Sequence, residues 1–292
     1  MSPIHRLVDR LERNESLDAI ADTLAAAGGP LRARPAVQDA LTGRWLGHSV
    51  HPMVVVVPIG CWVGSAILDV SSPASAAARR LIGVGVLAAG PAAVTGTADW
   101  LDTRGAERRV GAAHALANDV AVTAFALSWL VRRRKGRWLG LLLSGLGLGA
   151  TAVSGYLGGH LAYVRGVGVN TTAFQSGPDD WQRVGMVDAL EPGVPTRLRA
   201  DGVDLVAVCQ DDRVAILEDR CTHRGGPLSD GDVIDGCIEC PWHGTRFDLA
   251  DGSVRQGPAS IPQPVYETRL VDGAVEIRRT EIGSLRANVA GA

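Results

Sequence analysis

The sequence predicts a two-domain membrane protein, with an all-α four-helix transmembrane bundle followed by a small all-β domain. Two observations predict this fold class. Residues 48–164 are dominated by four long apolar segments, whereas residues 181–280 alternate short β-rich runs with turns. Residues 165–180, between them, lose both apolar content and periodicity and are typical of a linker. The change of composition therefore marks a domain boundary.

The N-terminal residues 1–47 are interpreted as an amphipathic helical region. Apolar residues recur at mostly helical spacing over residues 3–27, with charged residues between them. Such a region lies on the membrane surface or packs on a folded domain, and packing is the simpler interpretation. Arg6, Asp9 and Arg10 occupy the positions where a secretion signal would be apolar, so we expect no signal peptide.

The four apolar segments span about residues 51–70, 81–98, 110–131 and 138–164. Each approaches or exceeds the roughly 20 residues that a helix needs to cross the hydrocarbon core. Helices of a soluble bundle would each show a polar face, and these segments show almost none. We therefore expect a multi-pass protein of the cell membrane, with lipid around the four helices.

The C-terminal part has the pattern of a small all-β domain. Strand-like runs such as Val203–Cys209 and Val265–Leu270 are separated by turn signals at Asp201–Gly202 and Asp272–Gly273. The last residues, 281–292, are small and polar and are expected to form a tail.

Charge and cysteine content exclude two classes of protein. A formal net charge of −2 with no basic stripe argues against a nucleic-acid partner. Five cysteines are an odd number, and three of them lie in apolar or strand-like segments, which argues against a disulfide scaffold. We interpret Cys61, Cys209 and Cys237 as small buried apolar residues.

The other two cysteines belong to a metal-ligand pattern. Cys221-Thr-His223 is followed, further along the same domain, by Cys240-Pro-Trp-His243. Structural zinc sites usually take a pair of closely spaced cysteines from one turn, and C-x-H with C-x-x-H does not fit that spacing. The spacing therefore argues against a structural zinc site.

These two segments resemble the Rieske family over about residues 181–280. The resemblance is completed by the glycines and prolines of the two segments: Gly225, Gly226, Pro227, Pro241 and Gly244. It implies a [2Fe–2S] cluster in which Cys221 and Cys240 hold one iron and His223 and His243 hold the other, redox-active iron. It also implies that the glycines allow tight loops whose amide groups face the sulfur atoms.

The resemblance is to Rieske ferredoxins rather than to respiratory Rieske proteins. Respiratory members join their ligand loops by a disulfide, and Gly226 and Trp242 occupy those two positions here. They also carry a serine and a tyrosine whose hydroxyls raise the reduction potential, where this chain has Thr245 and Phe247. We expect a potential toward the low end of the Rieske range of about −150 to +300 mV.

The remaining histidines gather at one end of the predicted bundle. With alternating topology, His48, His51, His114 and His160 lie on the same side of the membrane, and the C-terminal domain emerges there too. Three interpretations stay open: haem b bound by histidines among His51, His114 and His160, a quinone pocket, or hydrogen-bonding groups at helix ends. This half resembles a bacterial four-helix membrane family of unknown function, which implies a topology but no activity.

The sequence gives conflicting indications of the side of the membrane on which the C-terminal domain lies. The loops opposite the histidines carry Arg79, Arg80 and the basic run 132–137, which the positive-inside rule places in the cytoplasm. The arginines on the histidine side are nearly as many. Because the cluster resembles those of ferredoxins that serve reductase and oxygenase systems, we expect the C-terminal domain on the cytoplasmic side.

The sequence therefore predicts a membrane-bound, ferredoxin-like one-electron transfer protein. It would receive electrons from a reductase or a quinol and pass them to a partner protein, as a component of an oxidoreductase system rather than as a self-contained enzyme. A Rieske oxygenase needs a second iron site on two further histidines, and the C-terminal part has none beyond the cluster motif. The alternatives are a quinol-oxidising or haem-containing oxidoreductase subunit, and a redox sensor acting through the N-terminal helix.

Overall fold

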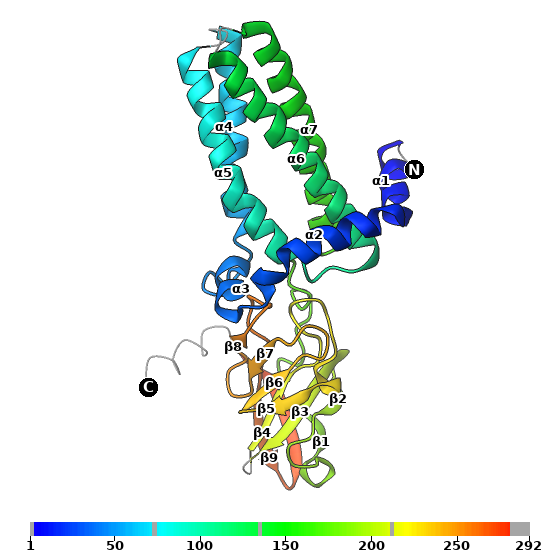
Figure 1. Cartoon of the computed structure of the whole chain (residues 1–292). Coiled ribbons are helices and arrows are strands. Elements are labelled where there is room, and N and C mark those ends of the chain that lie inside the picture. The colour runs from blue at the N-terminus through cyan, green and yellow to red at the C-terminus, as the bar shows by residue number, and fades with distance from the viewer. Residues whose placement is uncertain (1–2, 72–74, 134–135, 211–212, 281–292) are drawn as a thin grey trace. The chain divides into compact units, whose positions relative to one another are not determined.

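The structure, a computed structural model, consists of two compact units and describes residues 3–71, 75–133, 136–210 and 213–280. One unit comprises residues 1–41 and 49–168 and is helical, and the other comprises residues 42–48 and 169–292 and contains the strands of the described residues (Figure 1). The predicted combination of a helical bundle and a β domain is confirmed. The expected tail, residues 281–292, lies outside the described residues.

Four helices of the first unit are long and apolar enough to cross a membrane, as predicted. They contain 21 to 29 residues with mean hydropathies between 1.4 and 2.0. The helices are α4 (His51–Ser71), α5 (Ala76–Trp100), α6 (Gly105–Arg133) and α7 (Arg137–Tyr163). Large apolar side chains such as Leu87, 80% exposed, lie on the outer surface, where the hydrocarbon of a membrane would cover them. Ser75 caps α5, its hydroxyl accepting a hydrogen bond from the amide of Ala78.

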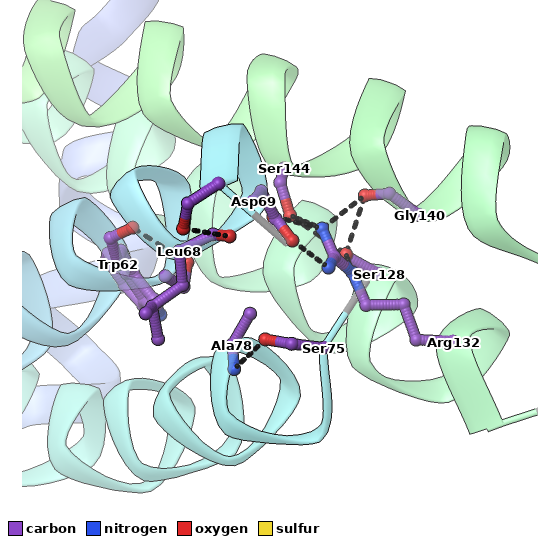
Figure 2. A network of polar contacts seen from close by, with 11 residues as sticks. Trp62, Leu68, Asp69, Ser75, Ala78, Ser128, Arg132, Gly140 and Ser144 are labelled. Carbon is purple, nitrogen blue, oxygen red and sulfur yellow. Dashed lines mark hydrogen bonds and ion pairs between the residues drawn. The ribbon is translucent and has the colours of Figure 1, made fainter. Parts of the chain in front are cut away.

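The helices form two hairpins, α4–α5 and α6–α7, which are joined by a buried ion pair (Figures 1 and 2). Arg132 of α6 donates two hydrogen bonds of 2.7 Å to the two carboxylate oxygens of Asp69 on α4. The guanidinium also contacts the hydroxyls of Ser128 and Ser144 at 3.1 and 3.2 Å. Because these partners hydrogen-bond the charges inside an apolar bundle, the pair is satisfied without water.

Three further helices precede the bundle: α1 (Pro3–Arg13), α2 (Ser16–Arg32) and α3 (Pro35–Thr42). Val8 is buried in a cluster with residues of α6 and α7. Asp18 accepts two hydrogen bonds of 2.7 Å from Arg109, and Asp22 accepts one of 2.8 Å from Arg108. Helices α1 and α2 of the N-terminal region thus pack on the membrane bundle.

The β unit contains three antiparallel sheets, with strand orders β1-β10-β9, β2-β3-β4 and β5-β6-β7-β8. The strands are β1 (Gln182–Met186), β2 (Thr196–Ala200), β3 (Val203–Gln210), β4 (Arg213–Glu218), β5 (Asp232–Ile234), β6 (Cys237–Glu239), β7 (Arg246–Asp248), β8 (Val254–Gln256), β9 (Tyr266–Val271) and β10 (Ala274–Arg279). Hairpin turns fall at Asp201–Gly202 and Asp272–Gly273, where both residues have positive φ. Short 3₁₀ turns follow β1 and precede β5.

Two segments at the ends of the membrane helices belong to the β unit. Arg44, in residues 42–48, donates a 2.8 Å hydrogen bond to the carbonyl of Arg255. The hydroxyl of Thr171 donates a 2.7 Å hydrogen bond to the carbonyl of Cys221. Within the segment expected to be a linker, Thr171 therefore contacts the first motif loop.

Candidate metal centre

The two motif segments form two loops of the same geometry. The first connects β4 to the 3₁₀ turn before β5, and the second connects β6 to β7. In each loop the amide of the cysteine donates to a carbonyl later in the same loop, from Cys221 to Gly226 at 2.9 Å and from Cys240 to Thr245 at 2.8 Å. The amides of Gly225 and Gly244 donate back to the carbonyls of the two cysteines, at 2.8 and 3.0 Å.

Glycine is required at these positions for two different reasons. Gly225 and Gly244 have φ of +75° and +72°, a conformation that other residues adopt at a cost. Gly226 lies against the other loop, because a Cβ atom there would be only 3.0 Å from the sulfur of Cys240 and 2.9 Å from Cγ of Trp242. The predicted tight loops are present, and a cysteine at position 226 would not fit this packing.

The loops bring the four predicted ligand residues together as two pairs. Cys221 and Cys240 are buried, and their thiols are joined by a hydrogen bond. The rings of His223 and His243 lie with their centroids 5.0 Å apart, nearly perpendicular to each other, and are less buried than the thiols. The thiol pair thus lies inside and the imidazole pair lies nearer the surface.

The electrostatics at the thiols favour bound negative charge. The hydrogen bond from the Cys221 thiol lowers the pKa of Cys240 to about 7, and the backbone amides of Trp242 and His243 act in the same direction. The same hydrogen bond and burial raise the pKa of Cys221, while the amides of His223 and Arg224 oppose that rise. Amide groups of both loops therefore face the sulfur atoms, as a cluster with anionic sulfur requires.

The observed arrangement fits a two-iron cluster better than a single ion. A structural zinc ion needs four ligands around one point. Within the described residues, the histidine, cysteine and carboxylate side chains form no group of three or more around one point. Two thiols on one side and two imidazoles on the other match the donor set of a Rieske cluster.

One residue that supports the first loop carries no signal in the sequence. Gln263, 2% exposed, accepts a 3.0 Å hydrogen bond from the amide of Thr222 and donates to the carbonyls of Glu218 and Arg220 at 2.7 and 2.8 Å. It lies far along the chain from the loop and belongs to no motif. Its role follows only from the tertiary structure.

The histidines of the membrane bundle have different surroundings. The ring nitrogen Nδ1 of His51 lies 2.9 Å from the carbonyl of Ala92, and that of His114 lies 2.9 Å from the carbonyl of Ser154. His160 instead pairs with Glu12 of α1, with Nε2 2.8 Å from the carboxylate, which also pairs with Arg165. The hydrogen bond from Arg165 lowers the pKa of Glu12, and burial opposes this shift. His160 therefore anchors α1.

Two families match the chain. Residues 180–267 match the family described as Rieske [2Fe-2S] domain, and residues 47–171 match the family described as Predicted membrane protein (DUF2231). The predicted fusion of a Rieske domain with a membrane domain is therefore confirmed.

Two similar proteins are ferredoxins of dioxygenase systems. The anthranilate 1,2-dioxygenase ferredoxin subunit of Burkholderia cepacia is 35% identical over 99 residues, covering 34% of this chain and 91% of the subunit. Ferredoxin CarAc of Metapseudomonas resinovorans is 32% identical over 98 residues, covering 33% and 92%. Pheophorbide a oxygenase of Oryza sativa is 37% identical over 89 residues, but the match covers only 16% of that enzyme.

A solved structure is also similar to the β unit in sequence. The ferredoxin of carbazole 1,9a-dioxygenase from Nocardioides aromaticivorans is 29% identical, with 34% of this chain and 98% of the ferredoxin covered and a TM-score of 0.33. That score is too low for an argument about the fold of the whole chain. The sequence matches and the paired loops are sufficient: through its C-terminal domain the chain belongs to the Rieske [2Fe–2S] ferredoxins, here fused to a DUF2231 membrane domain, and it is a membrane-associated electron-transfer protein.

Proposed function

We propose that the chain is a membrane-tethered one-electron carrier of the low-potential, ferredoxin type. Cys221 and Cys240 would hold one iron of the cluster, and His223 and His243 would hold the other. The observation that carries this proposal is the pairing of two buried thiols with two more exposed imidazoles on loops of equal geometry. When bound, the cluster supplies one-electron chemistry, and the imidazole side is the natural exit for the electron because it lies nearest the surface.

The low potential follows from what surrounds the sulfur atoms. No disulfide joins the two loops, since Gly226 and Trp242 occupy the two positions where respiratory Rieske proteins have the paired cysteines. Phe247 is fully buried and has no hydroxyl to donate. The hydroxyl oxygen of Thr245 accepts a 3.1 Å hydrogen bond from the amide of Ala259 and keeps its own proton, so Thr245 can replace only one of the two hydroxyls. With fewer donors to the cluster, the more negative reduced form is less stabilised and the potential stays low.

Electron paramagnetic resonance with a redox titration of the detergent-purified protein tests this proposal. We expect the rhombic signal of a reduced Rieske cluster and a midpoint below about +100 mV. Phe247→Tyr should raise the midpoint, because its hydroxyl would be placed beside the cluster loops. Zinc with no iron in the purified protein, or a midpoint well above about +100 mV, would contradict the assignment.

We further propose a reductase as electron donor, an oxygenase-type or other redox protein as acceptor, and a cytoplasmic location for the β unit. Support comes from the similarity to ferredoxin subunits of dioxygenases. The basic residues in the loops opposite the histidines would favour the reverse orientation under the positive-inside rule. Their weight is smaller than their number suggests, since Arg132 is buried in the pair with Asp69. A fluorescent-protein fusion at the C-terminus should fluoresce, whereas an active alkaline phosphatase fusion there would place the cluster outside.

We also propose a second redox site, in the membrane bundle. Of the two cofactors considered for it, haem b and quinone, the contacts of the bundle histidines favour haem b. A quinone carbonyl needs a hydrogen-bond donor, and His51 and His114 direct their Nδ1 atoms at backbone carbonyls instead.

A further inference from the structure

The two hairpins of the membrane bundle are two copies of one unit. In their second helices, Leu-Ile-Gly-Val-Gly-Val-Leu-Ala at 81–88 matches Leu-Ser-Gly-Leu-Gly-Leu-Gly-Ala at 143–150. In their first helices one constant offset aligns His51 with His114 and Ser65 with Ser128. The chain therefore contains an internal repeat.

Burial within the bundle follows the same alignment. Every residue of α4 that is buried has a buried counterpart in α6: Pro58 and Ala121, Trp62 and Phe125, Ser65 and Ser128, Asp69 and Arg132. In α5 and α7 the buried counterparts include Ile82 and Ser144, Gly85 and Gly147, Ala92 and Ser154, Thr95 and Leu157. The two hairpins thus pack with equivalent faces inward.

Two contacts join residues at equivalent positions of the two copies. The rings of Trp62 and Phe125 stack with centroids 4.4 Å apart, and Asp69 pairs with Arg132. Contacts between equivalent residues lie along the two-fold axis that relates two copies. An approximate two-fold axis therefore runs between α4 and α6, past these two pairs.

His51 and His114 lie on the faces that border this axis. Along α4, His51 and Trp62 are separated by about three helical turns, and Trp62 and Asp69 by about two. His114, Phe125 and Arg132 have the same spacing in α6.

Each histidine is held in the same way by the second helix of its own hairpin. The Nδ1 atoms face the carbonyls of Ala92 and Ser154 at 2.9 Å. Glycines let the rings pack against the helix backbone, because a Cβ atom on Gly96 would be 2.9 Å from Cε1 of His51, and one on Gly158 would be 3.2 Å from Cε1 of His114. Both rings are therefore fixed in orientation.

These hydrogen bonds also determine which ring nitrogen is available. A carbonyl only accepts, so the 2.9 Å contacts favour a proton on Nδ1 and, in the neutral imidazole, a lone pair at Nε2. The hydroxyls of Thr95 and Ser154, 3.4 and 3.0 Å from the same Nδ1 atoms, are compatible with this tautomer because a hydroxyl oxygen also accepts. At His114 the amide nitrogen of Asn118, a donor, lies 3.1 Å from Nε2, which agrees with this tautomer. Donation from Nδ1 to a carbonyl is the arrangement found at metal-bound histidines.

We propose that His51 and His114 are the two axial ligands of a haem b between the hairpins, and that His160 is not a ligand. A lone pair at Nε2 binds iron but cannot donate to a quinone carbonyl. An iron that already has four porphyrin nitrogens needs only two protein ligands, and the repeat supplies two. The Nε2 atom of His160 already pairs with the carboxylate of Glu12. This inference deepens the second redox site proposed above.

The test is haem content and the optical spectrum of the full-length protein, produced with added iron and 5-aminolaevulinate. We expect the wild type to hold haem with the sharp α band of a six-coordinate reduced haem, and His51→Ala and His114→Ala each to lose most of it. His160→Ala is the matched control and should keep its haem. Asn118→Ala should keep haem too, because that side chain must leave Nε2 when iron binds.

The Rieske signal of the same samples separates this inference from the function of the β unit. Wild type with a Rieske signal but no haem would overturn the haem site alone, as would loss of haem in His160→Ala with retention in His51→Ala. If an alanine variant fails to accumulate in the membrane, His→Met at the same position keeps a ligand. A shifted haem spectrum in that variant supports ligation, and an unchanged spectrum refutes it.

Discussion

The β unit and the membrane bundle both bring two equivalent segments together, but they hold them in different ways. In the β unit, two loops close together in the sequence are fixed by backbone hydrogen bonds from Cys221 and Cys240. In the bundle, two hairpins that lie further apart in the chain meet through side chains, above all Asp69 with Arg132. We infer that metal ligands come from loops in one unit and from helix faces in the other.

The difference teaches which changes each unit tolerates. Backbone hydrogen bonds survive most side-chain substitutions, so the cluster loops should fail mainly when a ligand or an obligatory glycine changes. A buried ion pair between helices has no such protection, because removal of one partner leaves an uncompensated charge in an apolar interior. Substitutions that damage one unit and spare the other are the direct test of this comparison.

The largest effect is expected from Cys240→Ser. A serine cannot replace the thiolate, so the cluster and its paramagnetic signal should be lost completely. Insertion into the membrane and the haem content should stay unchanged, since the loops and the spanning helices belong to different compact units. Cys237→Ser, in the adjacent strand, is the control and should keep the signal. Loss of membrane insertion in Cys240→Ser would contradict the independence of the two units.

The converse experiment is Asp69→Ala in the bundle. The variant leaves Arg132, whose side chain is 1% exposed, without its carboxylate, which costs about 3–5 kcal/mol for a buried pair. Thermal unfolding in detergent, followed by circular dichroism at a helix wavelength, should shift well below that of the wild type. The double variant Asp69→Ala with Arg132→Ala should recover part of the loss. An unchanged transition in the single variant would show that the pair does not hold the hairpins together.

A smaller, pH-dependent effect is expected at Glu218 in the β unit. Its carboxyl is fully buried, both oxygens lack a hydrogen-bond partner among the described residues, and burial raises its pKa to about 8. The folded state therefore keeps this proton after the unfolded state has lost it. Stability should fall as pH rises from about 4.5 to 8, by at most about 5 kcal/mol for this group.

Glu218→Gln should remove this dependence without disturbing the packing. The pH dependence of stability is measured in the full-length protein as the temperature at which heating bleaches the cluster absorbance, at pH 6 and at pH 8. The variant should exceed the wild type in stability by more at the higher pH than at the lower one. Equal differences at both pH values would show that Glu218 is ionised in the folded state.

The smallest effect is expected at the surface of the bundle, where α2 is held by Arg109. Its two 2.7 Å hydrogen bonds to Asp18 are partly exposed to solvent, so Arg109→Gln should lower the stability of the protein only slightly. Faster proteolysis of the N-terminal helices, with unchanged cluster and haem spectra, is the expected result. Arg10→Gln, an exposed residue of α1, is the control. A loss as large as that of Asp69→Ala would erase the distinction between buried and surface pairs.

Local patterns in the sequence were sufficient to predict the spanning helices and the candidate ligands of the cluster. Unbroken apolar runs predicted the four spanning helices, because a helix in lipid needs apolar residues on every face. The spacing of Cys221, His223, Cys240 and His243 predicted a ligand set, and the structure places the four together. That they bind iron stays a prediction.

Contacts between distant parts of the chain were decided only by the tertiary structure. The sequence left His51, His114 and His160 equivalent, and the fold separated them by giving His160 a carboxylate from α1 and the other two a backbone carbonyl. The repeat of the two hairpins is visible in the sequence only as a few matching glycines and apolar residues. Gln263, too, belongs to no pattern. Such roles depend on which segments meet, and that is determined by packing over the whole domain rather than by any local spacing.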